Sequence, residues 1–221
     1  MKSANVSWPL YIRNGFGRRL AQFGELVGSQ RLIYNPMVMR QFHDEAVANA
    51  SRVIPPVLGA FPNACRFLDV GSGSGAFSAE LLREAKLVVA LERSPHGRAL
   101  ADKQGVDCRP FDLMIQPPAR LDGAFDLVFC FEVAEHMPPF LGDKLIHFIA
   151  SLKTPVLFSA AHVGQGGTGH VNEQPDTYWI ERFVKLGFRF DPELTRRLRQ
   201  EFSGRGAASW FRTNPFVCFP T

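Results

Sequence analysis

The sequence predicts an α/β fold built on a doubly wound, mostly parallel sheet. From Arg66 onward, short continuous apolar runs alternate with amphipathic segments through the rest of the chain. That alternation is typical of strands buried on both faces and of the helices that cover them. The chain has 221 residues, of which 46% are hydrophobic, so it can bury one substantial core.

The first part of the chain, residues 1–62, is predicted to be a helical cap on the substrate side. Four apolar residues recur at helical spacing: Phe16, Leu20, Phe23 and Val27. A second helix is expected from about Met37 to Arg52. It should end before Pro55–Pro56, because the residue before a proline is driven away from helical geometry.

Residues 63–221 are predicted to form the sheet domain. The expected buried strands are Cys65–Val70, Leu87–Leu91, Leu127–Phe131 and Val156–Ala160, with a last strand at Phe216–Phe219. The expected helices are Gly75–Ala85, Pro139–Leu152 and Asp176–Leu186. In such sheets a ligand binds beyond the carboxyl ends of the strands, so the residues after each strand are the candidates for a functional site.

A glycine-rich loop follows the first predicted strand. Asp69 ends the strand, and Gly71, Gly73 and Gly75 follow at alternate positions before a helix. Glycine lets the backbone turn sharply and approach a ligand, and the helix N-terminus offers free N–H groups. The spacing also satisfies a loose G-x-G-x-x-A dinucleotide fingerprint that ends at Ala76. A tight turn that binds no ligand is the alternative.

Charge separates the possible nucleotide ligands. A pyrophosphate disfavours a carboxylate such as Asp69 just before the glycines, whereas a ligand with a cationic amino-acid portion and a sulfonium centre accepts one. Glu92 ends the second strand, where an acid suits the two hydroxyls of a ribose. The third strand region ends in Phe111 and Asp112, where an adenine amino group would lie, and Glu132 follows the fourth strand.

Taken together, these segments resemble the class I S-adenosylmethionine (SAM)-dependent methyltransferase family. The resemblance rests on DVGSGSG, Glu92, Phe111–Asp112 and FDLVFCFEVAEH, and it covers about residues 64–190. The family implies a Rossmann-like, seven-stranded sheet whose last strand is antiparallel. It also implies glycines that pack against the methionine part of the cofactor, with Glu92 on the ribose and Asp112 near the adenine. Residues 160–188 and the WFRTNPFVCF end further resemble a group of bacterial methyltransferases.

An acid and histidine cluster follows the fourth strand. Glu132, Glu135 and His136, completed by His170 or His162, suit a divalent cation with oxygen and nitrogen ligands. The run resembles the metal site of small-RNA 2′-O-methyltransferases and a run in ubiquinone-pathway O-methyltransferases. The alternative is a metal-free pocket in which Glu135 and His136 only donate and accept hydrogen bonds.

The loop from His162 to Gln174 combines four glycines with several polar side chains. Loops on a rigid scaffold often carry catalysis, so His170 is the first candidate for a general base and His162 the second. The alternative is that Asn172 or Asp176 only caps the following helix. Outside this loop, His43 is expected at the surface, and Asn214 is expected to pack or to close a sheet edge.

Composition limits the location and the partners that we expect for the protein. The four cysteines never form a C-x-x-C pair, and this argues against a disulfide framework or a structural zinc cluster. No apolar run approaches the ~20 residues that span a bilayer, and no signal peptide is recognised, so a cytoplasmic location without membrane contact is expected. The net charge is only +4. The arginines at 196, 197 and 199 are partly answered by Glu193 and Glu201, so no nucleic-acid partner is expected.

These observations predict SAM-dependent methyl transfer to an oxygen or nitrogen atom of a small molecule by in-line displacement, with S-adenosylhomocysteine (SAH) as the product. The chain is expected to act as a monomer or a homodimer, and a divalent cation is a further candidate cofactor. Two other functions stay open. One is a metal-assisted RNA 2′-O-methyltransferase, and the other is a non-methylating nucleotide-binding or NAD(P)-dependent protein.

Overall fold

The computed structural model describes residues 17, 19–24, 29–84, 86–115, 121 and 124–221. These residues form a seven-stranded sheet in the order β3-β2-β1-β4-β5-β7-β6. The strands are β1 (Arg66–Val70), β2 (Leu87–Glu92), β3 (Asp107–Pro110), β4 (Leu127–Phe131), β5 (Val156–Ser159), β6 (Phe188–Phe190) and β7 (Phe216–Pro220). Neighbouring strands from β3 to β5 pair in parallel, whereas β7 is antiparallel to both β5 and β6. The predicted fold class is therefore confirmed.

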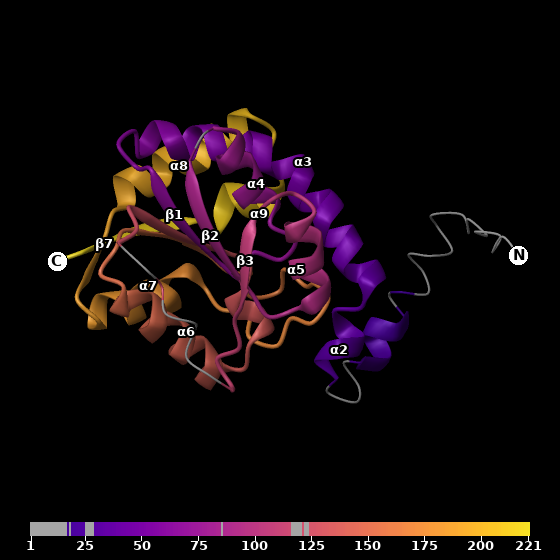
Figure 1. Ribbon diagram of the computed structural model, residues 1–221. Helices are drawn as coiled ribbons and strands as arrows, with labels where there is room; N and C mark the ends of the chain where they lie inside the picture. The colour runs from indigo at the N-terminus through magenta and orange to yellow at the C-terminus, as the bar shows by residue number, and fades with distance from the viewer. Residues whose placement is uncertain (1–16, 18, 25–28, 85, 116–120, 122–123) are drawn as a thin grey trace, which may run out of the picture.

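Helices cover both faces of this sheet (Figure 1). One face carries α3 (Pro36–Ala60), α4 (Ala76–Arg83), α5 (Pro95–Asp102), α8 (Pro192–Gly204) and α9 (Ser209–Thr213). The other carries α6 (Pro139–Ser151) and α7 (Asp176–Lys185). The short helix α2 (Gln30–Ile33) precedes α3, and a 3-10 turn, η1 (Ala134–His136), follows β4. The strand order reverses between β1 and β4, and in such sheets this is where ligands bind.

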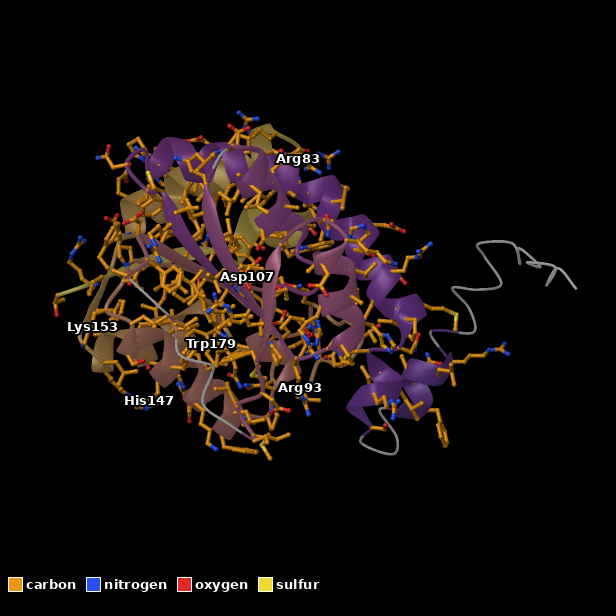
Figure 2. The ribbon with its side chains drawn as sticks, viewed as in Figure 1. Arg83, Arg93, Asp107, His147, Lys153 and Trp179 are labelled. Atoms are coloured by element: carbon orange, nitrogen blue, oxygen red, sulfur yellow. The ribbon has the colours of Figure 1, made fainter. Side chains whose placement is uncertain are left out.

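The central strand β4 shows how the sequence builds both layers. Leu127 and Phe129 face the layer of α3, α4 and α8, while Val128 and Cys130 face the layer of α6 and α7. All four side chains are buried, as expected for a parallel strand covered on both faces. Figure 2 shows Trp179 inside the second layer, whereas the surface residues Arg83, His147 and Lys153 lie at the periphery.

Helix α3 is longer than the sequence predicts. It runs to Ala60 and includes Pro55 and Pro56, so the expectation that it ends before these prolines is wrong. A proline inside a helix costs about 3 kcal/mol or more. Here Val53, Ile54 and Val57 are buried in the core cluster that contains β1 and β4, and their packing helps to offset the cost of the two prolines.

The segment before α3 is described only in part. Residues 19–24 are helical, in agreement with the predicted first helix, and Phe23 within them is exposed. Phe16 and Val27, the ends of the predicted apolar stripe, lie outside the described residues. Asn35 caps α3 by accepting hydrogen bonds from the N–H groups of Met37 and Val38. Among the described residues, no helix has the length and apolar character that crossing a membrane requires.

Candidate functional site

The glycine loop connects β1 to α4 at the point where the strand order reverses. Gly71 has φ of +76°, and a Cβ at this position would lie 2.5 Å from the Cγ2 atom of Val133. Gly73 also has a positive φ, but a Cβ there would have no heavy atom of the described residues within 4 Å. The loop is therefore closely packed at Gly71 and open at Gly73, where a ligand can approach the backbone.

Glu92 lies at the end of β2, beside this open position. One carboxylate oxygen accepts a hydrogen bond from the N–H of Gly73 at 2.8 Å, and the other accepts one from the N–H of Ser94 at 2.5 Å. The side chain is buried, and burial raises its pKa, while the two N–H groups act in the opposite direction. Glu92 is thus a fixed acceptor pair at the carboxyl edge of the sheet.

Asp69 lies buried beneath the loop, near the end of β1. The hydroxyl of Ser78 donates a hydrogen bond of 2.6 Å to its carboxylate. Burial raises the pKa of Asp69 to about 7; the Ser78 hydrogen bond lowers it, and the charge of Glu92 raises it further. Near neutral pH the carboxyl group is therefore only partly ionised.

The end of β3 brings Phe111 and Asp112 next to Glu92. The N–H of Phe111 donates to the carbonyl of Glu92 at 3.2 Å, and its buried ring packs against Phe148 with the centroids 5.1 Å apart. Asp112 lies nearer the surface and forms an ion pair of 2.9 Å with Arg93. The cofactor candidates from β1, β2 and β3 therefore occupy one edge of the sheet.

Glu132, the first residue after β4, has an unusual backbone. Its φ is +53°, in the left-handed region that non-glycine residues seldom adopt. Its carboxylate accepts hydrogen bonds from the side-chain amides of Asn214, at 3.1 and 3.2 Å, and of Gln165, at 3.2 Å. Asn214, expected only to pack or to close an edge, lies in the site. Sequence reasoning missed it because it comes from the end of α9, far along the chain.

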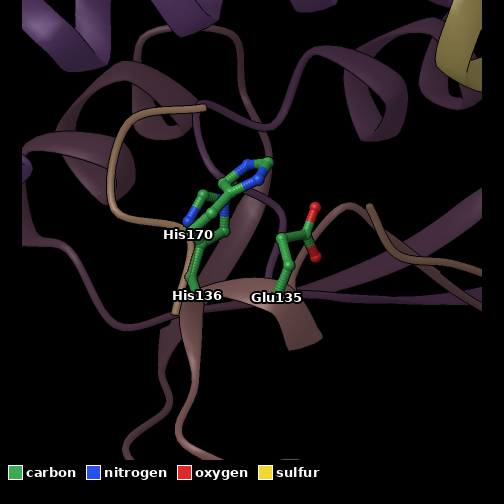
Figure 3. A group of neighbouring side chains, drawn as sticks. All are labelled: Glu135, His136 and His170. Carbon is green, nitrogen blue, oxygen red and sulfur yellow. The ribbon is translucent and has the colours of Figure 1, made fainter. Parts of the chain in front are cut away.

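Two histidines and an acid meet beside Glu132. Glu135 and His136 belong to η1, and His170 comes from the loop after β5 (Figure 3). One possible ligand atom from each of the three lies within 4.8 Å of the others, and the two rings meet edge to face with centroids 4.9 Å apart. Glu132 is not in this group. Both carboxyl oxygens of Glu135 are buried without a hydrogen-bond partner among the described residues.

Burial decides the charge of this cluster. It raises the pKa of Glu135 well above the ordinary value, and the neighbouring Glu132 carboxylate raises it further. Burial also lowers the pKa of His136 to about 4, with the nearby His170 acting in the same direction. At neutral pH His136 is therefore uncharged, and burial favours the neutral form of Glu135 as well.

The loop that carries His170 is internally ordered. Glu173 accepts hydrogen bonds from the N–H groups of Gly164 and Gly166, at 2.8 and 2.7 Å, and contacts the Nδ1 atom of His170 at 2.8 Å. These contacts lower the pKa of Glu173, the His170 contact most. The N–H groups of residues 171 and 172 donate to the carbonyl of Glu135. The loop is thereby anchored to η1.

The structure adds to two further interpretations of this region. The helix α7 has no side-chain cap, so neither Asn172 nor Asp176 serves as the cap that the alternative reading of the loop required. His43 is not a plain surface residue, because its Nδ1 atom lies 2.9 Å from the hydroxyl of Ser74 in the glycine loop. His162, the second candidate base, follows β5, and its Nε2 atom is buried without a hydrogen-bond partner in the described part of the chain.

The N-terminal segment covers both loops. Besides His43, Tyr34 approaches the histidine cluster, with its ring edge-on to His136 at a centroid distance of 5.7 Å. A Cβ at Gly169 would lie 2.9 Å from the Tyr34 hydroxyl and 3.1 Å from the Ile33 side chain. Residues on either side of the α3 N-terminus thus close over the carboxyl edge of the sheet.

Comparisons with known proteins agree with this geometry. A family profile described as a methyltransferase domain matches residues 39–214. Among solved structures, the mitomycin 7-O-methyltransferase MmcR has a TM-score of 0.62 and 16% identity, over 97% of this chain and 68% of that one. PigF with SAH has a TM-score of 0.61 and 16% identity, over 98% and 71%.

A third solved structure is the sugar N-methyltransferase KedS8 from Streptoalloteichus, with a TM-score of 0.58 and 16% identity over 78% of this chain and 87% of that one. At such identities these likenesses show the fold alone. The search of curated proteins found no match.

Proposed function

Because the chain belongs to the class I SAM-dependent methyltransferases, we propose that it methylates an oxygen or nitrogen atom of a small molecule by in-line displacement. The observation that carries the proposal is the open backbone at Gly73 beside the buried carboxylate of Glu92. The neighbours MmcR and KedS8, named for methyl transfer to oxygen and to nitrogen of small molecules, support the class of acceptor.

The residues at this edge fit an adenosine that carries a cationic sulfur. In the described part of the chain nothing occupies the space where any other residue at Gly73 would place a Cβ, and Glu92 offers two carboxylate oxygens suited to ribose hydroxyls. Asp69, beneath the same loop, suits a cationic ligand because a positive charge nearby would ionise its partly protonated carboxyl. We assign Gly71 and Gly75 to the loop that approaches the methionine part.

The end of β3 and the end of β4 complete the proposed cofactor pocket. Phe111 and Asp112 lie beside Glu92 and are assigned to the adenine side. Glu132 is assigned to the methionine side, where the amides of Asn214 and Gln165 hold its carboxylate. When bound, SAM supplies a methyl group on a positively charged sulfur, which is already activated for attack by a lone pair.

The protein's own task is then to align the reactants, exclude water and accept a proton. Alignment of two reactants can account for roughly 7–11 kcal/mol of the barrier. Tyr34, Ile33 and the start of α3 lie over the acceptor side and would exclude water there. We propose that the proton goes to a histidine of the glycine-rich loop, either His170, which Glu173 orients, or His162, whose Nε2 atom has no hydrogen-bond partner among the described residues.

The arginines of α8 favour a small acceptor over RNA. Arg196 pairs with Glu193, Arg197 with Glu201, and Arg199 with Asp176. Each positive charge is therefore answered by an acid, and the group does not form the basic stripe that phosphate backbones require.

The acceptor can be found by incubating the chain with metabolite pools and SAM labelled in its methyl group. We expect the label in a small molecule. In His162→Ala and His170→Ala we expect lower turnover while the affinity for SAH stays near that of the wild type, because neither side chain is assigned to the cofactor. Loss of a positioned base lowers the rate by about 10²–10⁴-fold.

The surface variant His147→Ala is the matched control and should turn over normally. Transfer of the label to RNA but to no metabolite would contradict the small-molecule assignment. Full turnover in both loop variants would remove these histidines as proton acceptors.

A further inference from the structure

We propose that Glu135, His136 and His170 form a binding site for a divalent transition-metal cation, for which Zn²⁺ is the probe. The three side chains converge from η1 and from the loop after β5, with one possible ligand atom from each lying within 4.8 Å of the others (Figure 3). The inference concerns binding, and it bears on the methyl transfer proposed above only by deciding which of the two histidines accepts the proton.

The carboxyl group of Glu135 lacks hydrogen bonds from the described residues. The residue is 0% exposed, and neither carboxyl oxygen has a hydrogen-bond partner among the described residues. The Nδ1 atom of His136, next in the chain, is also buried without a partner. Buried polar groups in folded proteins are almost always paired, and burying them unpaired is costly. A cation between the three side chains would satisfy these groups at once.

Glu173 holds the ring of His170 in an orientation that suits a metal ligand. Its Nδ1 atom lies 2.8 Å from a carboxylate oxygen of Glu173, and that carboxylate is itself fixed by two backbone N–H groups. Histidines that bind metals characteristically use one ring nitrogen for the metal and the other for such a partner. A Cβ at Gly167 would lie 2.3 Å from the Nε2 atom, so only glycine lets the loop pass this close to the His170 ring.

The spacing is slightly wider than a bound ion needs. Ligand atoms about 2.0–2.2 Å from one ion lie roughly 3–3.5 Å apart, so the three side chains must close by about 1 Å. His170 can supply this movement, because four glycines precede it in its loop: Gly164, Gly166, Gly167 and Gly169. Glu132 stays outside the set, since the amides of Asn214 and Gln165 already hold it.

The types of ligand atom also favour some metal ions over others. Two imidazole nitrogens and one carboxylate suit Zn²⁺ and its first-row neighbours, whereas Mg²⁺ prefers oxygen ligands and retains its waters. Three protein ligands leave positions open on the ion, as in catalytic zinc sites. With His170 acting as a ligand, the proton acceptor of the two candidates above is His162.

The test is calorimetric titration of the full chain, freed of metal with a chelator, with Zn²⁺ and separately with Mg²⁺. We expect one Zn²⁺ per chain and no saturable Mg²⁺ binding. Glu135→Gln keeps the size of the buried group and should fold as the wild type does. It should weaken Zn²⁺ binding by more than roughly 100-fold, because loss of a residue that only holds a ligand in place costs roughly 10–100-fold. Glu173→Gln, which changes that outer partner, should fall within this range.

His147→Ala removes an exposed histidine on α6 and is the control for binding of Zn²⁺ to surface imidazoles. It should leave the affinity unchanged, and His170→Ala should abolish saturable binding. The proposal is overturned if the wild type binds no Zn²⁺, or if Glu135→Gln binds it as tightly as the wild type does. Circular dichroism of each variant shows whether the fold is retained, and titration with SAH tests the cofactor site separately.

Discussion

At the scale of single residues, the site is unusual because several of its acidic side chains are buried. Asp69, Glu92 and Glu135 are all buried, and burial raises the pKa of each. The carboxylate of Glu92 still accepts two backbone N–H groups, whereas Glu135 accepts no hydrogen bond from described residues. Burying an acid that is not fully paired destabilises the folded state, so these residues indicate ligand binding more than stability.

Asp69 makes this cost measurable through pH. Its pKa is about 7 in the folded chain and 3.8 as the ordinary value, so between these values the folded chain holds a proton that the unfolded chain has lost. Its contribution to stability therefore falls as pH rises through this window. We expect Asp69→Asn, which does not titrate, to be more stable than the wild type at pH 8, by about 1–3 kcal/mol, and to lose most of that advantage at pH 4.

Chemical denaturation at the two pH values measures the difference, and titration with SAM measures the accompanying loss of affinity for a cationic ligand. The exposed acid Asp107, paired with Arg109, is the control, since Asp107→Asn should show little dependence of this kind. Equal stability of Asp69→Asn and the wild type at pH 8 would show that Asp69 is not held in a costly state.

At the scale of elements, the glycine loop depends on two different properties of glycine. Gly71 needs both a left-handed backbone and the absence of a Cβ, because Val133 occupies the space where the Cβ would be. We expect Gly71→Ala to lower the free energy of unfolding by about 2–4 kcal/mol, from backbone strain and overpacking together. Thermal and chemical denaturation measure this change.

Gly59 provides the matched control. It lies inside α3, and a Cβ there would have no heavy atom of the described residues within 4 Å, so Gly59→Ala should stabilise the chain by about 0.5–1 kcal/mol. If the two variants were equally stable, the close approach of the loop to Val133 would not hold.

The same scale shows what the sequence predicts well. Strand β4 was expected at Leu127–Phe131 and is found there, because five apolar residues buried on both faces leave a clear signal. Strand β6 has only three residues and was not predicted, and β3 lies at the sheet edge with a mixed polar sequence. The length of α3 was wrong because tertiary packing outweighed the local effect of Pro55 and Pro56.

The candidate site also has a part that the sequence predicts and a part that only the structure shows. That Asp69, the three glycines of the loop and Glu92 lie together could be predicted because each directly follows or ends a buried strand, and the fold brings such positions to one edge. The contacts of Glu132 with Asn214, and of His43 with Ser74, join segments far apart in the chain. No periodicity or local spacing in the sequence records such contacts, so only the structure places them.

At the scale of the whole molecule, the fold concentrates its chemistry at one edge. Side chains after β1, β2, β3, β4 and β5 meet there, and residues around the start of α3 cover them. The opposite, amino-terminal edge of the sheet carries no comparable group of histidines and acids in the described part of the chain. The sites proposed for the cofactor, the acceptor and the cation therefore all lie at this one edge of the sheet.

The most direct test of this account is calorimetric titration of the chain with SAH, with NAD as the comparison ligand. We expect one SAH per chain and no saturable binding of NAD. Glu92→Ala should weaken SAH binding by about 1–3 kcal/mol through the loss of a charge-assisted pair, and Asp107→Ala, on the exposed edge of β3, should not. Absence of SAH binding, or an affinity for SAH that Glu92→Ala leaves unchanged, would contradict the assignment of the carboxyl edge of the sheet to the cofactor.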